Sequence, residues 1–173
     1  MTEALSGKPL KSERDPATAA GAMWDSKAVF AGRQTVSLVA SDFHGRWDVR
    51  RTIVDHLSGT VHRFAGEAVI SADDFVEAGK VCHGDVSFSA ERRYVLRPGA
   101  DGMADGVTVA FADGRSFIGL AAQASQAVRH LCGADDYRGR FFFRNGNAWV
   151  EAWRVTGPRK RYASLAHYSR QAL

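Results

Sequence analysis

The sequence lacks the features that anchor, secrete or covalently staple a protein. It contains two cysteines, Cys82 and Cys132, and neither belongs to a Cys-x-x-Cys pair. Sparse, unpaired thiols are typical of a reducing intracellular compartment. No apolar run approaches the roughly 18 residues needed to cross a bilayer, and the polar N-terminus lacks the apolar core of a signal peptide. These absences predict a cytoplasmic protein with no membrane partner.

Motifs for cofactors and metals are also absent. The sequence has no Gly-rich dinucleotide or phosphate loop and no Gly-x-Ser-x-Gly nucleophile motif. Its six histidines are isolated, without His-x-His or His-x-x-x-His spacing. A metal site needs several convergent ligands. The sequence therefore predicts no metal and no cofactor, and it leaves open whether the protein is an enzyme.

The charge is moderately basic, with a formal net charge of +4. The densest basic runs are Arg50-Arg51, Arg92-Arg93 and Arg159-Lys160-Arg161, and none is interleaved with aromatic residues as in RNA-binding sheets. This scatter predicts a solvated basic face and argues against nucleic acid as a partner. Nothing in the sequence indicates an oligomeric state.

Two regions differ in pattern. Residues 1–24 are polar and punctuated by Pro and Gly, which predicts a flexible tail before a single domain over residues 25–173. Apolar spacing from Ser26 to about Ser41 predicts a short amphipathic helix. From Trp47 onward the period changes to two, which is typical of half-buried strands.

Turn signals separate about nine or ten such strands. Pairs such as Asp113-Gly114 and Asn145-Gly146 favour tight hairpins, and Thr156–Lys160 is predicted to form the turn between the last two strands. Parallel strands would need crossover helices, and closure removes exposed sheet edges. The fold predicted is mainly β: an antiparallel up-and-down β-barrel with a short N-terminal helix. A β-sandwich is the alternative.

Two resemblances accompany this pattern. Gly45 and Trp47, after a short helix, resemble the Gly-x-Trp of calycins such as lipocalins and fatty-acid-binding proteins. That resemblance implies a barrel with an apolar interior, an interior arginine for an anionic head group, and a late basic residue over the Trp. Arg154, Arg159 or Lys160 is the candidate for this last role.

The second resemblance is to an uncharacterised bacterial and fungal family of unknown function. It spans roughly Phe43 to Arg170 and implies one compact domain without naming an activity. The motifs that carry it are Gly45-Arg46-Trp47, Asp113-Gly114-Arg115, His130-Leu131-Cys132 with Asp136-Tyr137, and Trp153 to Lys160.

If Trp47 points inward, alternation assigns the other interior residues. The predicted ligand-binding residues are Trp47, Arg51, Arg92, Phe111, Phe117, Phe141, Phe143, Glu151 and Trp153. The predicted acid–base candidates on the same faces are His130, Tyr94, Tyr137 and Glu77. Cys132 also falls on an inward face, where it is expected to pack as a small buried residue.

The interior charges have two readings. Arg51 and Arg92 either pair with Glu77 and Glu151 across the barrel, as buried charges normally do, or one arginine holds the carboxylate of a ligand. The leading hypothesis is a barrel that binds a small hydrophobic ligand, with or without a negative charge. The alternatives are a small barrel enzyme (isomerase, cyclase or lyase) acting on a hydrophobic metabolite, and an interaction module with a fully packed core.

Overall fold

The computed structural model describes residues 40–100, 103–144 and 146–172. They form one short 3-10 turn, η1 (Ala40–Phe43), and ten strands. The strands are β1 (Gly45–Asp55), β2 (Thr60–Ile70), β3 (Asp74–His83), β4 (Val86–Ala100), β5 (Met103–Ala110), β6 (Ser116–Leu120), β7 (Ser125–Cys132), β8 (Asp135–Arg144), β9 (Ala148–Gly157) and β10 (Lys160–Arg170). The predicted tail, and the predicted helix up to residue 39, lie outside the described residues. No helix in the described part is long and apolar enough to cross a membrane.

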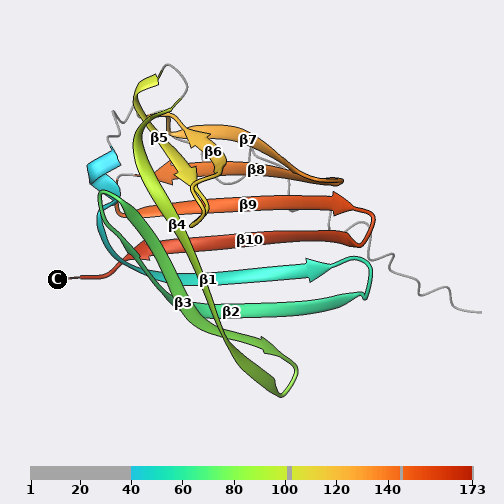
Figure 1. Cartoon of the computed structure of the whole chain (residues 1–173). Coiled ribbons are helices and arrows are strands. Elements are labelled where there is room, and N and C mark those ends of the chain that lie inside the picture. The colour runs from blue at the N-terminus through green and yellow to red at the C-terminus, as the bar shows by residue number, and fades with distance from the viewer. Residues whose placement is uncertain (1–39, 101–102, 145, 173) are drawn as a thin grey trace, which may run out of the picture. The chain divides into compact units, whose positions relative to one another are not determined.

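All ten strands belong to one antiparallel sheet in the order β6-β5-β4-β3-β2-β1-β10-β9-β8-β7. The first and last strands of the chain, β1 and β10, pair with each other, from Trp47 opposite Arg170 to Asp55 opposite Tyr162. In Figure 1, β4 runs steeply across the layer formed by β8, β9, β10, β1 and β2. The predicted up-and-down barrel is therefore confirmed, and a single continuous sheet replaces the two sheets of the alternative.

The barrel is nearly closed where β6 approaches β7. The Gln126 side chain accepts a hydrogen bond from the Ala121 backbone N–H (2.8 Å) and donates one to the Ala121 carbonyl (2.9 Å). One side chain thus supplies the pair of bonds that a neighbouring strand would make. The Phe143 N–H adds a bond to the Ala124 carbonyl (2.8 Å). These contacts satisfy backbone groups that an open edge would expose.

The strands alternate as the period of two predicts. On β1, Trp47 and Val49 are buried while Arg46, Asp48 and Arg50 are exposed. Trp47, Tyr168, Glu77, Val49 and Val155 are the largest fully buried side chains. The inward register assumed from Trp47 is therefore the one the barrel adopts.

The turns follow the residues that favour them. Gly114 and Gly146 have φ of 85° and 62°, a region that costs glycine little but strains other residues. The chain also turns between β9 and β10, as predicted for Thr156–Lys160. One interior assignment was wrong: Cys132, like Cys82, is exposed. Cys132 is the last residue of β7, where alternation no longer implies cover from the opposite wall.

Trp47 is covered by a basic residue, but not by one of those predicted. The Arg170 guanidinium lies 4.4 Å from the centre of the Trp47 ring. Arg154 is instead exposed on β9, Arg159 lies in the β9–β10 turn, and Lys160 bonds to other groups. Arg170 is opposite Trp47 in the β1–β10 register, so strand pairing brings the two together.

Arg170 and Trp47 together hold η1 against the end of the barrel. Arg170 donates hydrogen bonds to the carbonyls of His44 (2.8 Å), Gly146 (2.9 Å) and Asp42. The Trp47 indole N–H donates to the Phe43 carbonyl at 2.9 Å. The bonds to Asp42, Phe43 and His44 satisfy carbonyls in and next to the turn that precedes β1, and the bond to Gly146 connects Arg170 with the β8–β9 turn.

Candidate functional site

The barrel contains a cavity of about 310 Å³. Its lining is mostly apolar, and it comes from η1, the strands from β2 to β6, β8 and β9, and the residues next to them. The lining residues are Ala40, Phe43, His44, Ile70, Ala72, Asp73, Phe75, Arg92, Tyr94, Leu96, Arg97, Pro98, Val107, Val109, Phe117, Ile118, Leu120, Ala121, Ala122, Phe141, Phe143, Trp149, Glu151 and Trp153. We call this set the cavity wall. It makes room for a small molecule inside the barrel.

Aromatic rings dominate the cavity wall and lie in two stacks. In the first, Phe117 lies between Tyr94 and Trp153, with both centroid distances 5.4 Å and interplanar angles of 5° and 21°. In the second, Phe141 stacks on Trp149 at 6.1 Å and 18°. Phe141 meets Trp153 edge-on, at 88°, and so connects the two stacks. Offset-stacked and edge-on pairs are the favourable arrangements for aromatic rings.

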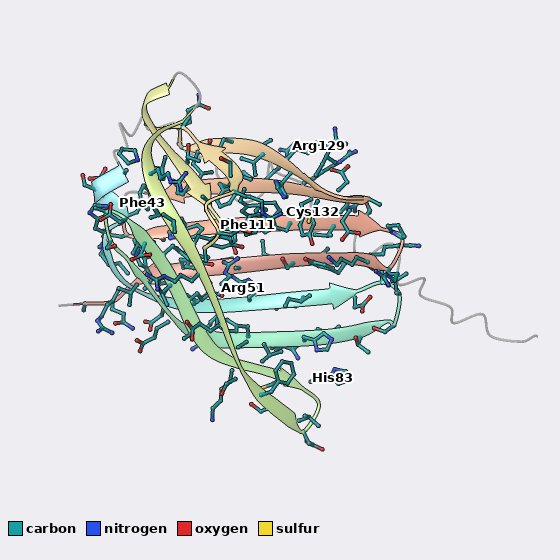
Figure 2. All side chains as sticks on the ribbon, viewed as in Figure 1. Phe43, Arg51, His83, Phe111, Arg129 and Cys132 are labelled. Atoms are coloured by element: carbon teal, nitrogen blue, oxygen red, sulfur yellow. The ribbon has the colours of Figure 1, made fainter. Side chains whose placement is uncertain are left out.

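A charged cluster forms one part of the interior. It consists of Arg51 on β1, Glu77 on β3, Arg92 on β4, Glu151 on β9 and Tyr168 on β10; Figure 2 labels Arg51 near the middle of the strands. Of the five, Arg92 and Glu151 belong to the cavity wall. Alternation brings all five to the inner face: four lie an even number of residues from a buried neighbour on their own strand, and Arg92 lies two residues from Tyr94, which lines the cavity.

Short hydrogen bonds connect the cluster. The Arg51 guanidinium donates to both Glu77 oxygens (2.6 and 2.9 Å), to Glu151 Oε1 (2.9 Å) and to the Tyr168 hydroxyl (2.8 Å). Arg92 Nη2 donates to Glu77 Oε2 (3.0 Å), Glu151 Oε1 (2.6 Å) and the Tyr168 hydroxyl (2.5 Å). Tyr168 donates in turn to Glu77 Oε2 at 2.7 Å. The arginines therefore pair with the glutamates across the barrel, the first of the two readings.

The cluster carries no net charge. Burial favours the neutral form of Glu77, but attraction to Arg92 and hydrogen bonding from Arg51 lower the pKa of its carboxyl. Burial also opposes the charge on Arg92, yet the Glu151 and Glu77 carboxylates beside it raise its pKa well above the usual range. Burial raises the pKa of Tyr168, so its phenol stays protonated. Two guanidinium cations thus face two carboxylate anions.

Two residues of the cavity wall each contain a buried N–H group without a partner. Arg92 Nε and Trp149 Nε1 are buried and make no hydrogen bond to the described residues. Both are donors only. An unsatisfied buried donor costs free energy, so these two residues retain hydrogen-bonding capacity that the protein itself does not use.

The cavity wall includes part of the predicted set of ligand-binding residues. Those on the wall are Arg92, Phe117, Phe141, Phe143, Glu151 and Trp153. Arg51 lies behind Arg92 in the charged cluster, and Trp47 is in the core beneath Arg170. Phe111 packs beside the wall, with its ring 5.1 Å from that of Phe117.

The predicted acid–base candidates do not meet at one point. Tyr94 is on the cavity wall, whereas Glu77 is held in the charged cluster. The His130 ring packs against Phe117 at 4.9 Å, and the Tyr137 hydroxyl accepts a hydrogen bond from Lys160 at 2.9 Å. Neither His130 nor Tyr137 is part of the cavity wall. Among the described residues, no three His, Cys, Asp or Glu side chains gather where they could hold a metal ion.

Three residues of the site were not predicted from the sequence, and alternation could have found two of them. Trp149 is two residues before Glu151, so it shares the inner face of β9 and lines the cavity. Tyr168 lies opposite Trp149 in the β9–β10 register and stacks on it at 3.6 Å and 7°. The third, Phe43, precedes the first strand, where alternation gives no information.

Gly139 leaves room for Trp153. A Cβ atom at Gly139 would lie 2.8 Å from Trp153 Cζ3 and 2.8 Å from Val128 Cγ2, closer than carbon atoms pack. We expect Gly139→Ala to displace Trp153 and to lower the free energy of unfolding by about 1–3 kcal/mol. Urea unfolding measures this, with the exposed Arg140→Ala on the same strand as the control. Equal stability of the two variants would contradict the close packing.

Comparisons with known proteins give a family and several similar folds. The model for a family of unknown function, DUF6314, matches residues 43–170. No curated protein matches the chain. The S-type phycobiliprotein lyase CPES from Guillardia theta is 9% identical with a TM-score of 0.48, covering 77% of this chain and 90% of that chain.

Two other solved structures are similar at the same level. A DUF3598-family protein of unknown function from Nostoc punctiforme is 11% identical with a TM-score of 0.42, covering 80% of this chain and 51% of that chain. A de novo designed fluorescence-activating β-barrel is 14% identical with a TM-score of 0.38, covering 76% and 96%. At these identities the similarity concerns the fold alone.

Proposed function

We propose that this chain, which belongs to the DUF6314 family of proteins of unknown function, binds a small apolar molecule in its barrel. The observation that carries the proposal is the cavity of about 310 Å³, whose wall is mostly aromatic and aliphatic and includes Arg92 and Glu151 of the charged cluster. Ligand pockets typically measure about 300–1,000 Å³ and combine an apolar lining with few polar groups. The cavity is at the small end of that range.

The volume limits the size of the ligand. A molecule of one or two rings fits within about 310 Å³. An interaction module with a fully packed core is the weaker hypothesis, because its interior would leave no such space.

The enzyme hypothesis has less support than binding. Tyr94 is the one predicted acid–base candidate on the cavity wall, and burial raises the pKa of its hydroxyl. A phenol that stays protonated serves as a hydrogen-bond donor more readily than as a general base. His130, the strongest general-base candidate by residue type, is packed among aromatic rings beside the wall.

A variant that fills the cavity tests the proposal. Val107 is a half-buried wall residue on β5, and Val107→Trp adds a large side chain there. We expect binding of a neutral solvatochromic naphthalene dye, followed by its own fluorescence, to weaken at least ~10-fold because the space is occupied. Thr52→Trp on the exposed face of β1 is the matched control and should bind the dye like the unmodified chain.

Native mass spectrometry of the purified full chain gives an independent reading. A small molecule bound at one per chain, and absent from Val107→Trp, supports the proposal. If the dye binds both Trp variants equally, or if it does not bind the unmodified chain, cavity binding is contradicted.

A further inference from the structure

The charged cluster constrains the charge of the ligand. Arg51 and Arg92 already share Glu77 and Glu151, through five contacts of 2.6–3.0 Å between guanidinium nitrogens and carboxylate oxygens. A ligand carboxylate beside Arg92 would be a third anion among two cations. Burying a charge without its own counter-charge is costly. The charged cluster therefore disfavours, at its own end of the cavity, the anionic ligand that an interior arginine alone would suggest.

The unused hydrogen-bonding groups constrain the polar group of the ligand. Arg92 Nε and Trp149 Nε1 are donors without partners, and both residues lie on the cavity wall. Arg92 also retains the largest exposed fraction of the four charged side chains, 28%, against 10% or less for the others. The complementary group is an acceptor that carries no formal charge, such as a carbonyl oxygen.

The two aromatic stacks constrain the shape of the ligand. The rings of Tyr94, Phe117 and Trp153 are near parallel, and the Phe141–Trp149 stack meets them edge-on. A planar ring added to such a wall finds both faces and edges to contact, and these contacts add to simple area burial. A flexible alkyl chain gains only the free energy of burying its apolar surface.

The geometry points to a neutral aromatic carbonyl compound of one or two rings as the ligand class, with its oxygen toward Arg92 and Trp149. This inference rests on the proposed function, because it concerns the same cavity. It also differs from the fatty-acid type of ligand, which combines an alkyl chain with a carboxylate.

Four matched probes separate charge, acceptor and shape: 2-acetylnaphthalene, 2-naphthoate, 2-ethylnaphthalene and 2-decanone. Displacement of the bound dye from the full chain measures their relative affinities. We expect the aromatic ketone to bind at least ~5-fold more tightly than the hydrocarbon, because it adds a hydrogen bond to an otherwise unpaired donor. It should exceed the carboxylate by at least ~10-fold and also bind more tightly than the aliphatic ketone.

Changing the charge of the cluster should change the preference. Glu151→Gln is nearly isosteric and makes the cluster +1, which supplies a cation for a carboxylate. The ratio of naphthoate to acetylnaphthalene affinity should then rise by at least ~10-fold. Circular dichroism checks that the variant folds, and Glu77→Gln makes the same change in charge if it does not.

The outcomes distinguish this inference from the proposed function. If the dye binds in the cavity but naphthoate equals or exceeds the aromatic ketone on the unmodified chain, the inference is wrong and cavity binding stands. The same holds if 2-decanone binds best. If neither the dye nor any probe binds, both fail.

Discussion

Arg51→Met should lower the free energy of unfolding by about 3–5 kcal/mol, because it removes one partner from a buried ion pair. Arg51 is only 10% exposed and Glu77 is 2% exposed. The substitution leaves two carboxylates with the single guanidinium of Arg92, and it removes four hydrogen bonds donated by Arg51. Urea or guanidinium unfolding, with the midpoint and slope fitted together, measures the change.

The matched control is an exposed pair on neighbouring strands. Arg93 contacts Asp74 at 2.9 Å, but the two side chains are 57% and 36% exposed. Arg93→Met should therefore cost no more than about 1 kcal/mol. A loss at Arg51 as small as the loss at Arg93 would contradict a buried, mutually dependent cluster.

Acid provides a second readout of the same variant. The pKa of Glu77 is lowered in the folded protein, so its ionisation stabilises the fold above the unfolded-state pKa of about 4.5. That contribution is lost as the pH falls below this value toward the lower folded pKa. Arg51→Met removes part of the cause of the lowered pKa. The stability difference between the variant and the unmodified chain should therefore narrow as the pH falls from 6 to below about 4.5.

Much of the site could be predicted from alternation alone. Alternation with a period of two determines which side of the sheet each residue faces. Taking Trp47 as an inward-facing residue therefore assigned the inner faces of most strands. This reasoning brought Arg51, Arg92, Glu77 and Glu151 to the interior, where they contact one another.

Alternation does not say how far along the barrel axis a residue lies. Phe111, His130 and Tyr137 share the inward orientation of the cavity wall but lie beyond it, packed against one another. Cys132 has the inward parity as well, yet the end of its strand is exposed. The depth depends on the stagger between strands, which hydrogen-bond register fixes and composition does not.

Identifying the residue that covers Trp47 also required the strand register. Basic residues are frequent near the C-terminus, so sequence distance did not distinguish Arg154, Arg159 and Lys160 from Arg170. The pairing of β1 with β10 does, because it makes Arg170 the direct neighbour of Trp47. That pairing joins the first and last strands of the chain, which are far apart in sequence, so no local sequence pattern predicts it.

Trp47→Ala should lower the free energy of unfolding by about 3–5 kcal/mol, the range for removing a large aromatic side chain from a core. Trp47 is 0% exposed and is overlaid by the Arg170 guanidinium at 4.4 Å. Its indole also holds η1 through the 2.9 Å bond to the Phe43 carbonyl. Because Phe43 is part of the cavity wall, losing the indole affects both the core and the cavity.

Trp47→Phe separates these two roles. It retains an aromatic ring beneath Arg170 but cannot donate to the Phe43 carbonyl, so we expect a smaller loss of stability, about 1–2 kcal/mol. Release of a bound naphthalene dye should nevertheless become faster than in the unmodified chain, because η1 is held by fewer bonds. Stopped-flow dilution measures that rate. An unchanged rate in Trp47→Phe would mean that Arg170, through its bonds to the carbonyls of Asp42 and His44, holds the turn without help from Trp47.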